Sequence, residues 1–259
     1  MGVVNVTPDS FSDGGRFLDP AAAIAHAHKQ IAEGADLVDI GAESSRPGAA
    51  AVVSVDEELR RLLPVLRGLR DIRVPVSVDT LKPEVMRAAL AEGASMINDI
   101  SALRAPGALA AVAASDAAVC LMHMQGTPGT MQQHPSYADV VAEVKAFLLE
   151  RVRAARDAGI APERITIDPG FGFGKTLEHN LELLRHLREF DVLGAPLLAG
   201  WSRKSSLGKI TGKPAGDRLA AGIAAALIAA QNGASILRVH DVAATRDALS
   251  VLAAVEEAK

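Results

Sequence analysis

A strand-like run followed by a helix-like segment recurs eight times along the chain, and this alternation limits the possible folds more than any other feature. Each run is short and apolar or β-branched, and it passes into a loop with polar side chains, glycine or proline. The expected strands lie within residues 1–6, 36–40, 74–80, 95–100, 117–125, 165–168, 195–200 and 234–241. The expected helices cover 21–33, 56–70, 83–92, a short stretch from Pro106, 137–158, 177–190, 217–232 and 244–257. Strands separated by helices predict a parallel sheet.

Eight such units in 259 residues match the size of one closed barrel of eight parallel strands surrounded by helices. We therefore predict an α/β protein with the (β/α)8 TIM-barrel fold, in which residues 1–259 form a single domain. An open doubly wound sheet is the alternative arrangement of the same units. No linker, low-complexity run or shift in composition divides the chain.

Composition excludes several classes of protein. The net charge of −4 gives no basic footprint for nucleic acid, and aromatic residues make up only 3% of the chain. The longest apolar run, 219–230, is too short to span a bilayer. The single cysteine, Cys120, lies in an apolar run, where it is interpreted as a small buried hydrophobic residue. We predict a cytoplasmic protein with neither a nucleic-acid partner nor a membrane segment.

The stretch 165–175 shows how one of these units is built for function. A β-branched run ends on Asp168, and Pro169 and then Gly170, Gly172 and Gly174 follow, so the chain can turn sharply and approach a ligand closely. A lone buried carboxylate costs several kcal/mol unless it is paired or hydrogen-bonded. Asp168 therefore needs a partner, which could be a ligand.

In a TIM barrel the carboxyl ends of the strands share one mouth, so residues far apart in the sequence become neighbours. The residues expected there are Asn5, 43–46, Asp79, Asn98, His123, Asp168, Lys204, Arg238 and His240. The acidic or uncharged members Asp79, Asn98 and Asp168 suit a flat heterocycle with amino and ring N–H groups. The basic members are Arg46, Lys204, Arg238 and His240. They suit a phosphate or diphosphate, which a divalent cation could accompany.

Other readings of individual residues are less favourable. The segment 169–176 lacks the first glycine of a Walker-type loop, and its glycine spacing also misses the dinucleotide fingerprint. His123 lacks the neighbouring histidines of a zinc hydrolase. Asp39 and Asp99 are interpreted as acids that cap backbone groups, outside the site. The histidines at 26, 28, 179 and 186 lie on expected helices and suit solvated or packing roles.

Six motifs in order resemble one family. They are 5–15 (NVTPDSFSDGG), 43–48 (ESSRPG), 77–80 (SVDT), 168–175 (DPGFGFGK), 202–205 (SRKS) and 238–241 (RVHD). Together they cover essentially the whole chain and resemble dihydropteroate synthase. The resemblance implies that p-aminobenzoate displaces diphosphate from 6-hydroxymethyl-7,8-dihydropterin diphosphate, giving 7,8-dihydropteroate for folate synthesis.

The resemblance also implies a role for individual residues. The implied catalytic residues are Asp79, Asp168, Lys204, Arg46 and Asp13. The implied pterin contacts are Asp79, Asn98, Met122, Asp168, Phe173 and Lys204. The implied diphosphate contacts are Asn5, Arg46, Arg238 and His240, with Asn5 as a ligand of the magnesium cofactor. The implied p-aminobenzoate contacts are Phe11, Ser45, Pro47, Phe173, Lys204 and Ser205.

Two departures and two alternatives accompany the resemblance. Ser45 stands where the family usually has Thr. The chain begins within the expected first strand, so whether this strand is truncated, and how it closes the barrel, is left open. A pterin-binding methyltransferase domain shares the barrel, but the motifs at 43–48 and 202–205 argue against it. A non-catalytic paralogue is disfavoured because every motif position is filled. A homodimer is the usual state of the family.

Overall fold

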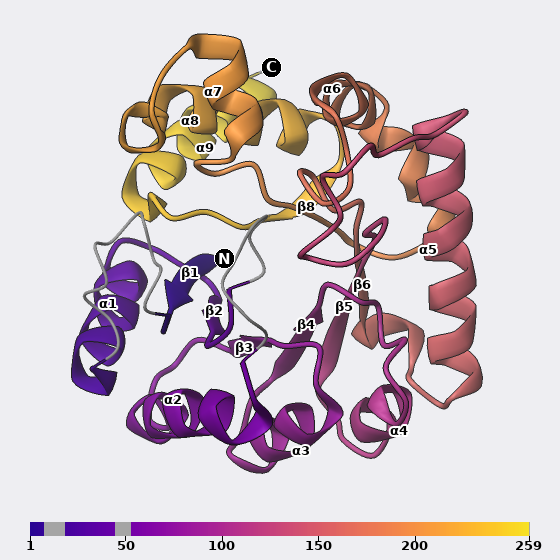
Figure 1. The fold of residues 1–259 in the computed structure, drawn as a ribbon. Helices are drawn as coiled ribbons and strands as arrows, with labels where there is room; N and C mark the ends of the chain where they lie inside the picture. Colours follow the sequence, from indigo (N-terminus) through magenta and orange to yellow (C-terminus); the bar gives the residue numbers. More distant parts are fainter. Residues whose placement is uncertain (8–18, 45–52, 259) are drawn as a thin grey trace.

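The computed structural model describes residues 1–7, 19–44 and 53–258 of the chain. Within them, eight parallel strands form one sheet in sequence order, with helices on its outer face (Figure 1). The strands are β1 Gly2–Asn5, β2 Val38–Gly41, β3 Val76–Asp79, β4 Met96–Asp99, β5 Ala118–Met122, β6 Ile165–Asp168, β7 Leu197–Ala199 and β8 Ala234–Leu237. This order confirms the barrel and makes the doubly wound alternative wrong, because that fold requires a reversal of strand order.

The first strand closes the barrel against the segment that follows β8. Val3 N donates to Val239 O at 3.0 Å, and Val239 N donates to Met1 O at 2.9 Å. Gly2 and Val239 form a parallel bridge. The strand that sequence alone left open is therefore paired on both edges, with β2 on the other side.

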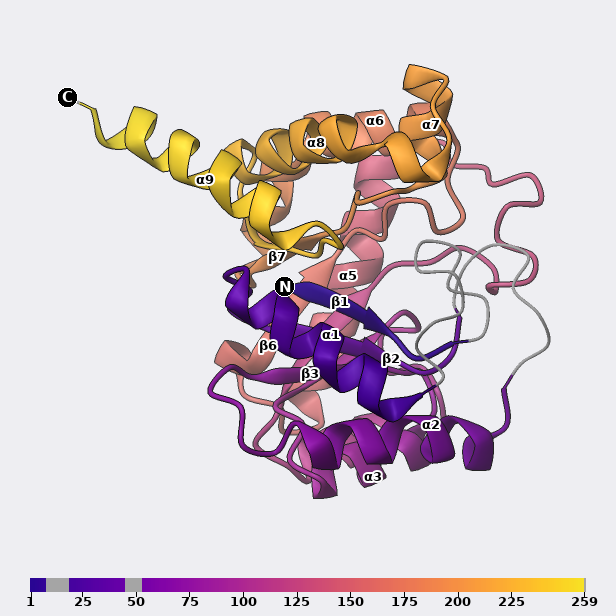
Figure 2. The same cartoon turned by 90° about the vertical axis from the view of Figure 1, so that its left-hand side faces the viewer.

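The helices mostly follow the expected ranges. They are α1 Pro20–Ala32, α2 Val55–Gly68, α3 Pro83–Ala91, α4 Ala108–Ala113, α5 Val140–Asp157, α6 Leu177–Arg185, α7 Ser205–Thr211, α8 Leu219–Gln231 and α9 Val242–Glu257. Short 3₁₀ turns occupy Pro162–Arg164, Leu187–Leu193 and Ala215–Asp217. The last turns of α9 lead away from the barrel (Figure 2). None of the helices in the described part of the chain is long and apolar enough to cross a membrane.

Two predicted helix boundaries were wrong, and one helix was not predicted. The helix expected over 177–190 stops at Arg185 and continues as a 3₁₀ turn. In that turn Leu187 and Phe190, three residues apart, are both buried, which suits three residues per turn. The start of α5 moves from Tyr137 to Val140 because Asp139 caps it, accepting from Ala142 N at 2.9 Å. Helix α7 was missed because seven residues are too few to show periodicity.

The core is aliphatic, as the low aromatic content requires. Val, Ile and Leu of the strands meet Ala, Val and Leu of the helices in one large cluster, and a smaller cluster contains Met96, Cys120 and Leu198. Cys120 is fully buried, so its interpretation as a packing residue is confirmed. This framework holds the carboxyl ends of all eight strands at one mouth.

Candidate active site

Polar residues at the ends of β3, β4 and β6 form the floor of the mouth. Asp79 ends β3 and is in register with Asn98 of β4, while Asp168 ends β6 opposite Met122 of β5. Asn98 and Asp168 are buried. Parallel pairing thus brings together three of the residues that the sequence predicted for a heterocycle site.

Asp39 belongs to the same polar cluster, so its interpretation as a backbone-capping acid was wrong. Its carboxylate is fully buried, and Oδ2 accepts from Arg238 Nε at 2.6 Å and from Asn98 Nδ2 at 3.1 Å. Arg238 also reaches Asp79, with Nη2 to Oδ2 at 3.0 Å. Strand alternation, which can be read from the sequence, places Asp39 on the same face of its strand as Gly41. The register found in the structure then pairs Gly41 with Asp79. Asp99, by contrast, does cap the backbone, accepting from Ser101 N and Leu103 N, each at 2.7 Å.

Burial dominates the electrostatics of this floor. It raises the pKa of Asp79 to about 7, although the Arg238 guanidinium opposes the change. Burial also raises the pKa of Asp168, against the opposing charge of Lys204. It lowers the pKa of Lys204 to about 8, with Asp168 working in the other direction. For Arg238, burial acts to lower the pKa, but the carboxylates of Asp39 and Asp79 outweigh it and raise the pKa. Groups held away from their ordinary pKa at a strand-end mouth are typical of an active site.

Lys204 lies against the glycine-rich loop that follows β6. Its Nζ donates to Phe171 O and lies 5.0 Å from the centroid of the Phe173 ring. A Cβ at Gly172 would come within 3.3 Å of the Lys204 side chain, so the missing side chain leaves room for the lysine. The predicted pterin contacts Phe173 and Lys204 are thus brought together.

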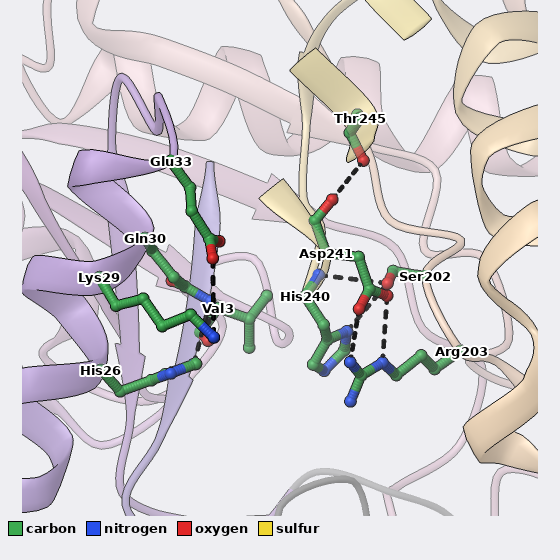
Figure 3. A network of polar contacts seen from close by, with 10 residues as sticks. All are labelled: Val3, His26, Lys29, Gln30, Glu33, Ser202, Arg203, His240, Asp241 and Thr245. Carbon is green, nitrogen blue, oxygen red and sulfur yellow. Dashed lines mark hydrogen bonds and ion pairs between the residues drawn. The ribbon is translucent and has the colours of Figure 1, made fainter. Parts of the chain in front are cut away.

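The loop after β7 and the segment after β8 are joined by polar contacts (Figure 3). His240 N and Nδ1 lie 3.2 and 3.0 Å from Ser202 Oγ. Arg203 donates to both carboxylate oxygens of Asp241, from Nη2 at 2.6 Å and from Nε at 3.2 Å (Figure 3). The two basic residues predicted from the last motif therefore have different partners, since Arg238 binds the carboxylates of Asp39 and Asp79 and His240 binds Ser202.

Asn5 ends β1 and faces the neighbouring strand ends. A Cβ added at Gly41 would be in van der Waals contact with Asp79 Cβ at 3.5 Å and with Asn5 Oδ1 and Asp79 Oδ2, each at 3.8 Å, so an amide oxygen and a carboxylate oxygen both lie next to this glycine. The described residues contain no cluster of three His, Cys, Asp or Glu side chains that could hold a metal by themselves. One or two protein oxygens combined with substrate phosphate oxygens are nevertheless how proteins usually bind Mg²⁺, so these donors fit that ion.

Five predicted site residues lie outside the described part of the chain: Phe11, Asp13, Ser45, Arg46 and Pro47. Ser205 is described and begins α7 directly after Lys204. His123 was expected in the mouth, and it is buried at the end of β5, where its Nδ1 lies 2.9 Å from Lys175 Nζ. Lys175 was not predicted as a partner of His123, because 52 residues separate the pair and only the register of β5 and β6 brings them together.

A closed barrel with carboxylates, an amide and cations at its strand ends defines an enzyme with a site for a polar heterocycle. The family model for pterin binding enzymes matches residues 1–240. Dihydropteroate synthase of Escherichia coli strain K12 is 50% identical over 260 residues, covering 100% of this chain and 92% of that protein. The chain belongs to the dihydropteroate synthases within this pterin-binding family, and it is a transferase.

Solved structures agree with this assignment. Xanthomonas albilineans dihydropteroate synthase with 4-aminobenzoic acid is 57% identical with a TM-score of 0.93, and the match covers 100% of this chain and 93% of that chain. Yersinia pestis dihydropteroate synthase with a sulfonamide drug is 47% identical with a TM-score of 0.97, covering 100% and 94%. The barrel seen here is therefore the fold of that family.

Proposed function

We propose that this chain condenses 6-hydroxymethyl-7,8-dihydropterin diphosphate with p-aminobenzoate to give 7,8-dihydropteroate and diphosphate in folate biosynthesis. The observation that carries the proposal is the gathering of Asp79, Asn98 and Asp168 at the ends of β3, β4 and β6, with the charge of Lys204 close enough to act on Asp168. Carboxylates and an amide can accept from the amino and ring N–H groups of a pterin, each charged hydrogen bond contributing about 1.5–3 kcal/mol.

The diphosphate end is assigned to Asn5, Arg46, Arg238 and His240. Asn5 would hold Mg²⁺ together with diphosphate oxygens, and the ion would neutralise negative charge on the leaving group when bound. Arg238 would meet the diphosphate with its guanidinium already oriented by Asp39 and Asp79. Arg46 and the catalytic assignment of Asp13 come from the resemblance alone.

The order of bond changes follows from the charges. The C–O bond to diphosphate breaks first and diphosphate leaves with the electron pair, so positive charge spreads into the pterin. Asp79 and Asp168 stabilise that charge as carboxylates, because a cation beside them favours the ionised form although burial alone raises both pKa values. The lone pair of the aniline nitrogen of p-aminobenzoate then bonds to the carbon, and the nitrogen releases a proton to water.

The p-aminobenzoate pocket is assigned to Phe11, Ser45, Pro47, Phe173, Lys204 and Ser205. The described members of this set adjoin one another, since Lys204 Nζ lies over the Phe173 ring and Ser205 follows Lys204. A sulfonamide resembles p-aminobenzoate in shape, so we propose that it competes at this pocket.

The proposed assembly is a cytoplasmic homodimer. The homodimeric state is supported by large apolar side chains that remain exposed on α7 and α8, namely Ile210, Leu219 and Ile228. Sedimentation velocity over a range of protein concentrations tests it. A species of one chain mass at every concentration would contradict it.

The test of the function is to measure diphosphate and dihydropteroate from pterin diphosphate, with and without p-aminobenzoate, in Mg²⁺ and after chelation. We expect equal amounts of both products with Mg²⁺, and suppression by a sulfonamide. Pterin binding without either product would contradict the proposal. Product formation unaffected by chelation would contradict only the role of magnesium.

A further inference from the structure

The lysine that closes the glycine-rich loop after β6 is buried and makes contacts that the proposed reaction does not use. Lys175 is 3% exposed. Its Nζ lies 2.9 Å from Gly170 O, 3.0 Å from Phe173 O and 2.9 Å from His123 Nδ1. Within residues 1–7, 19–44 and 53–258, no carboxylate forms an ion pair with this amine. Burying an amine is costly unless its hydrogen bonds are made, and here four acceptor atoms surround it, the fourth being His123 O at 3.4 Å.

His123 is suited to complete this set of acceptors. Burial, with the nearby Lys175 adding to it, lowers the pKa of His123 to about 3, so the imidazole is neutral. Its ring packs edge-on against Phe147, with centroids 4.9 Å apart, which fixes its orientation. Nδ1 of a neutral ring can then accept from the amine.

Asp168 and Lys175 both hold Gly170, Asp168 through the amide N–H of that residue and Lys175 through its carbonyl oxygen. Gly170 N donates to Asp168 Oδ1 at 2.7 Å, and Gly170 O lies beside the Lys175 amine and also accepts from Phe173 N at 3.1 Å. His123 N donates to Asp168 O at 3.0 Å. The contacts form a closed ring from Asp168 through His123 and Lys175 to Gly170.

The turn held in this way faces Lys204. Phe171 O accepts from Lys204 Nζ, and the Phe173 ring lies beneath the same amine. Gly172 N donates to Asn180 Oδ1 at 2.6 Å, which ties the middle of the turn to α6. A shift of the turn would therefore move both contacts of the Lys204 amine, whose charge opposes the rise in the pKa of Asp168.

We propose that Lys175 is a positioning residue, which fixes the turn 170–173 through Gly170 O, Phe173 O and His123 and thereby sets Lys204 beside Asp168. This inference rests on the proposed function, because it assigns Lys175 to the pterin end of that site. Lys175 itself acts through the loop rather than on the substrate.

The variant Lys175→Met tests the proposal, because methionine fills similar space without a donor. We expect the KM for 6-hydroxymethyl-7,8-dihydropterin diphosphate to rise about tenfold with a smaller change in kcat, since binding is weakened in ground and transition states alike. A second readout is the fluorescence of Trp201, the single tryptophan, whose ring lies 5.0 Å from that of Phe171. We expect its emission to shift in the variant.

The matched control is Ile160→Ala, which removes a buried side chain before β6, at the end of the barrel opposite to the loop. It should lower thermal stability while leaving the KM and Trp201 emission unchanged. Unchanged KM and emission in Lys175→Met would overturn the positioning role. If that variant does not fold, His123→Phe replaces it, and unchanged values there would overturn the role equally. Absence of turnover by the unsubstituted chain would count against the proposed function instead.

Discussion

Asp39 and Arg238 are 199 residues apart in the sequence, yet Asp39 Oδ2 accepts from Arg238 Nε at 2.6 Å in the floor of the barrel. The same guanidinium binds Asp79 at 3.0 Å, and Asn98 donates to the same Asp39 oxygen. Asp39 therefore orients two proposed substrate contacts without being one of them. A buried carboxylate with two partners is costly to remove, because the partners are then left buried with an unbalanced charge or an unmade hydrogen bond.

The first prediction concerns this pair. Asp39→Asn should lower the free energy of unfolding by about 3 kcal/mol, since it leaves Arg238 with one carboxylate in a buried site. Asp36→Asn is the control, because Asp36 pairs with Arg246 at 3.2 Å on the exposed surface and should cost less than about 1 kcal/mol. Chemical denaturation of both variants measures the difference. Equal losses would show that Asp39 contributes no more than a surface acid.

The second prediction separates two strand-end acids that look alike in sequence. Asp168→Asn should weaken pterin binding about tenfold or more, because a charged acceptor is lost. Asp99→Asn should lower thermal stability but leave pterin affinity unchanged, because Asp99 binds the amides of Ser101 and Leu103. Calorimetric titration with a pterin measures both. Full turnover and unchanged affinity in Asp168→Asn would contradict its proposed role.

Most of the fold could be predicted because hydrophobic periodicity and turn residues are local signals. The runs ending at Asp79, Asn98 and Asp168 were apolar and ended on polar side chains, so parallel pairing alone brought them to one mouth. Helix α7 was not predictable because it is too short to show a helical period. The 3₁₀ turn after Arg185 was not predictable because it is wound more tightly than an α-helix.

The partners within the site were harder to predict than its members. Asp39 lies inside an apolar run, and its counter-ion comes from the opposite end of the sequence. Lys175 finds His123 only through the register of β5 with β6, which no local pattern encodes. Long-range pairing depends on closure and register, so single-sequence patterns locate polar residues better than they pair them.

The third prediction is a pH dependence that belongs to Asp79. Its pKa is about 7 in the folded protein and about 4 when unfolded, so the folded state binds more protons between these values. Asp79 therefore stabilises the ligand-free protein fully below about pH 4, and this contribution is lost as pH rises through about 7. Asp79→Asn should remove that slope. Asp99 and Asp168, whose pKa values are also raised, remain in both proteins and largely cancel in the comparison.

Denaturation of the wild-type chain and Asp79→Asn at several pH values between about 4 and 8 tests this assignment. The stability of the wild type relative to the variant should fall as pH rises across that window and become constant above it. A constant difference at all pH values would mean that Asp79 titrates near its ordinary value.

The last prediction compares two glycines with the same backbone angle. Gly170 and Gly212 both have φ +71°, a conformation that costs another residue about 1–2 kcal/mol. A Cβ at Gly170 would overlap the carbonyl oxygen of His123, whereas a Cβ at Gly212 meets no described atom within 4 Å. Gly212→Ala should therefore lower the free energy of unfolding only by the cost of this backbone conformation, about 1–2 kcal/mol, and leave activity unchanged. Gly170→Ala should cost about 4 kcal/mol or more and weaken pterin binding, because the loop after β6 must move away from β5. Thermal unfolding and pterin titration of both variants measure the difference, and equal losses would mean that this loop is not held against His123.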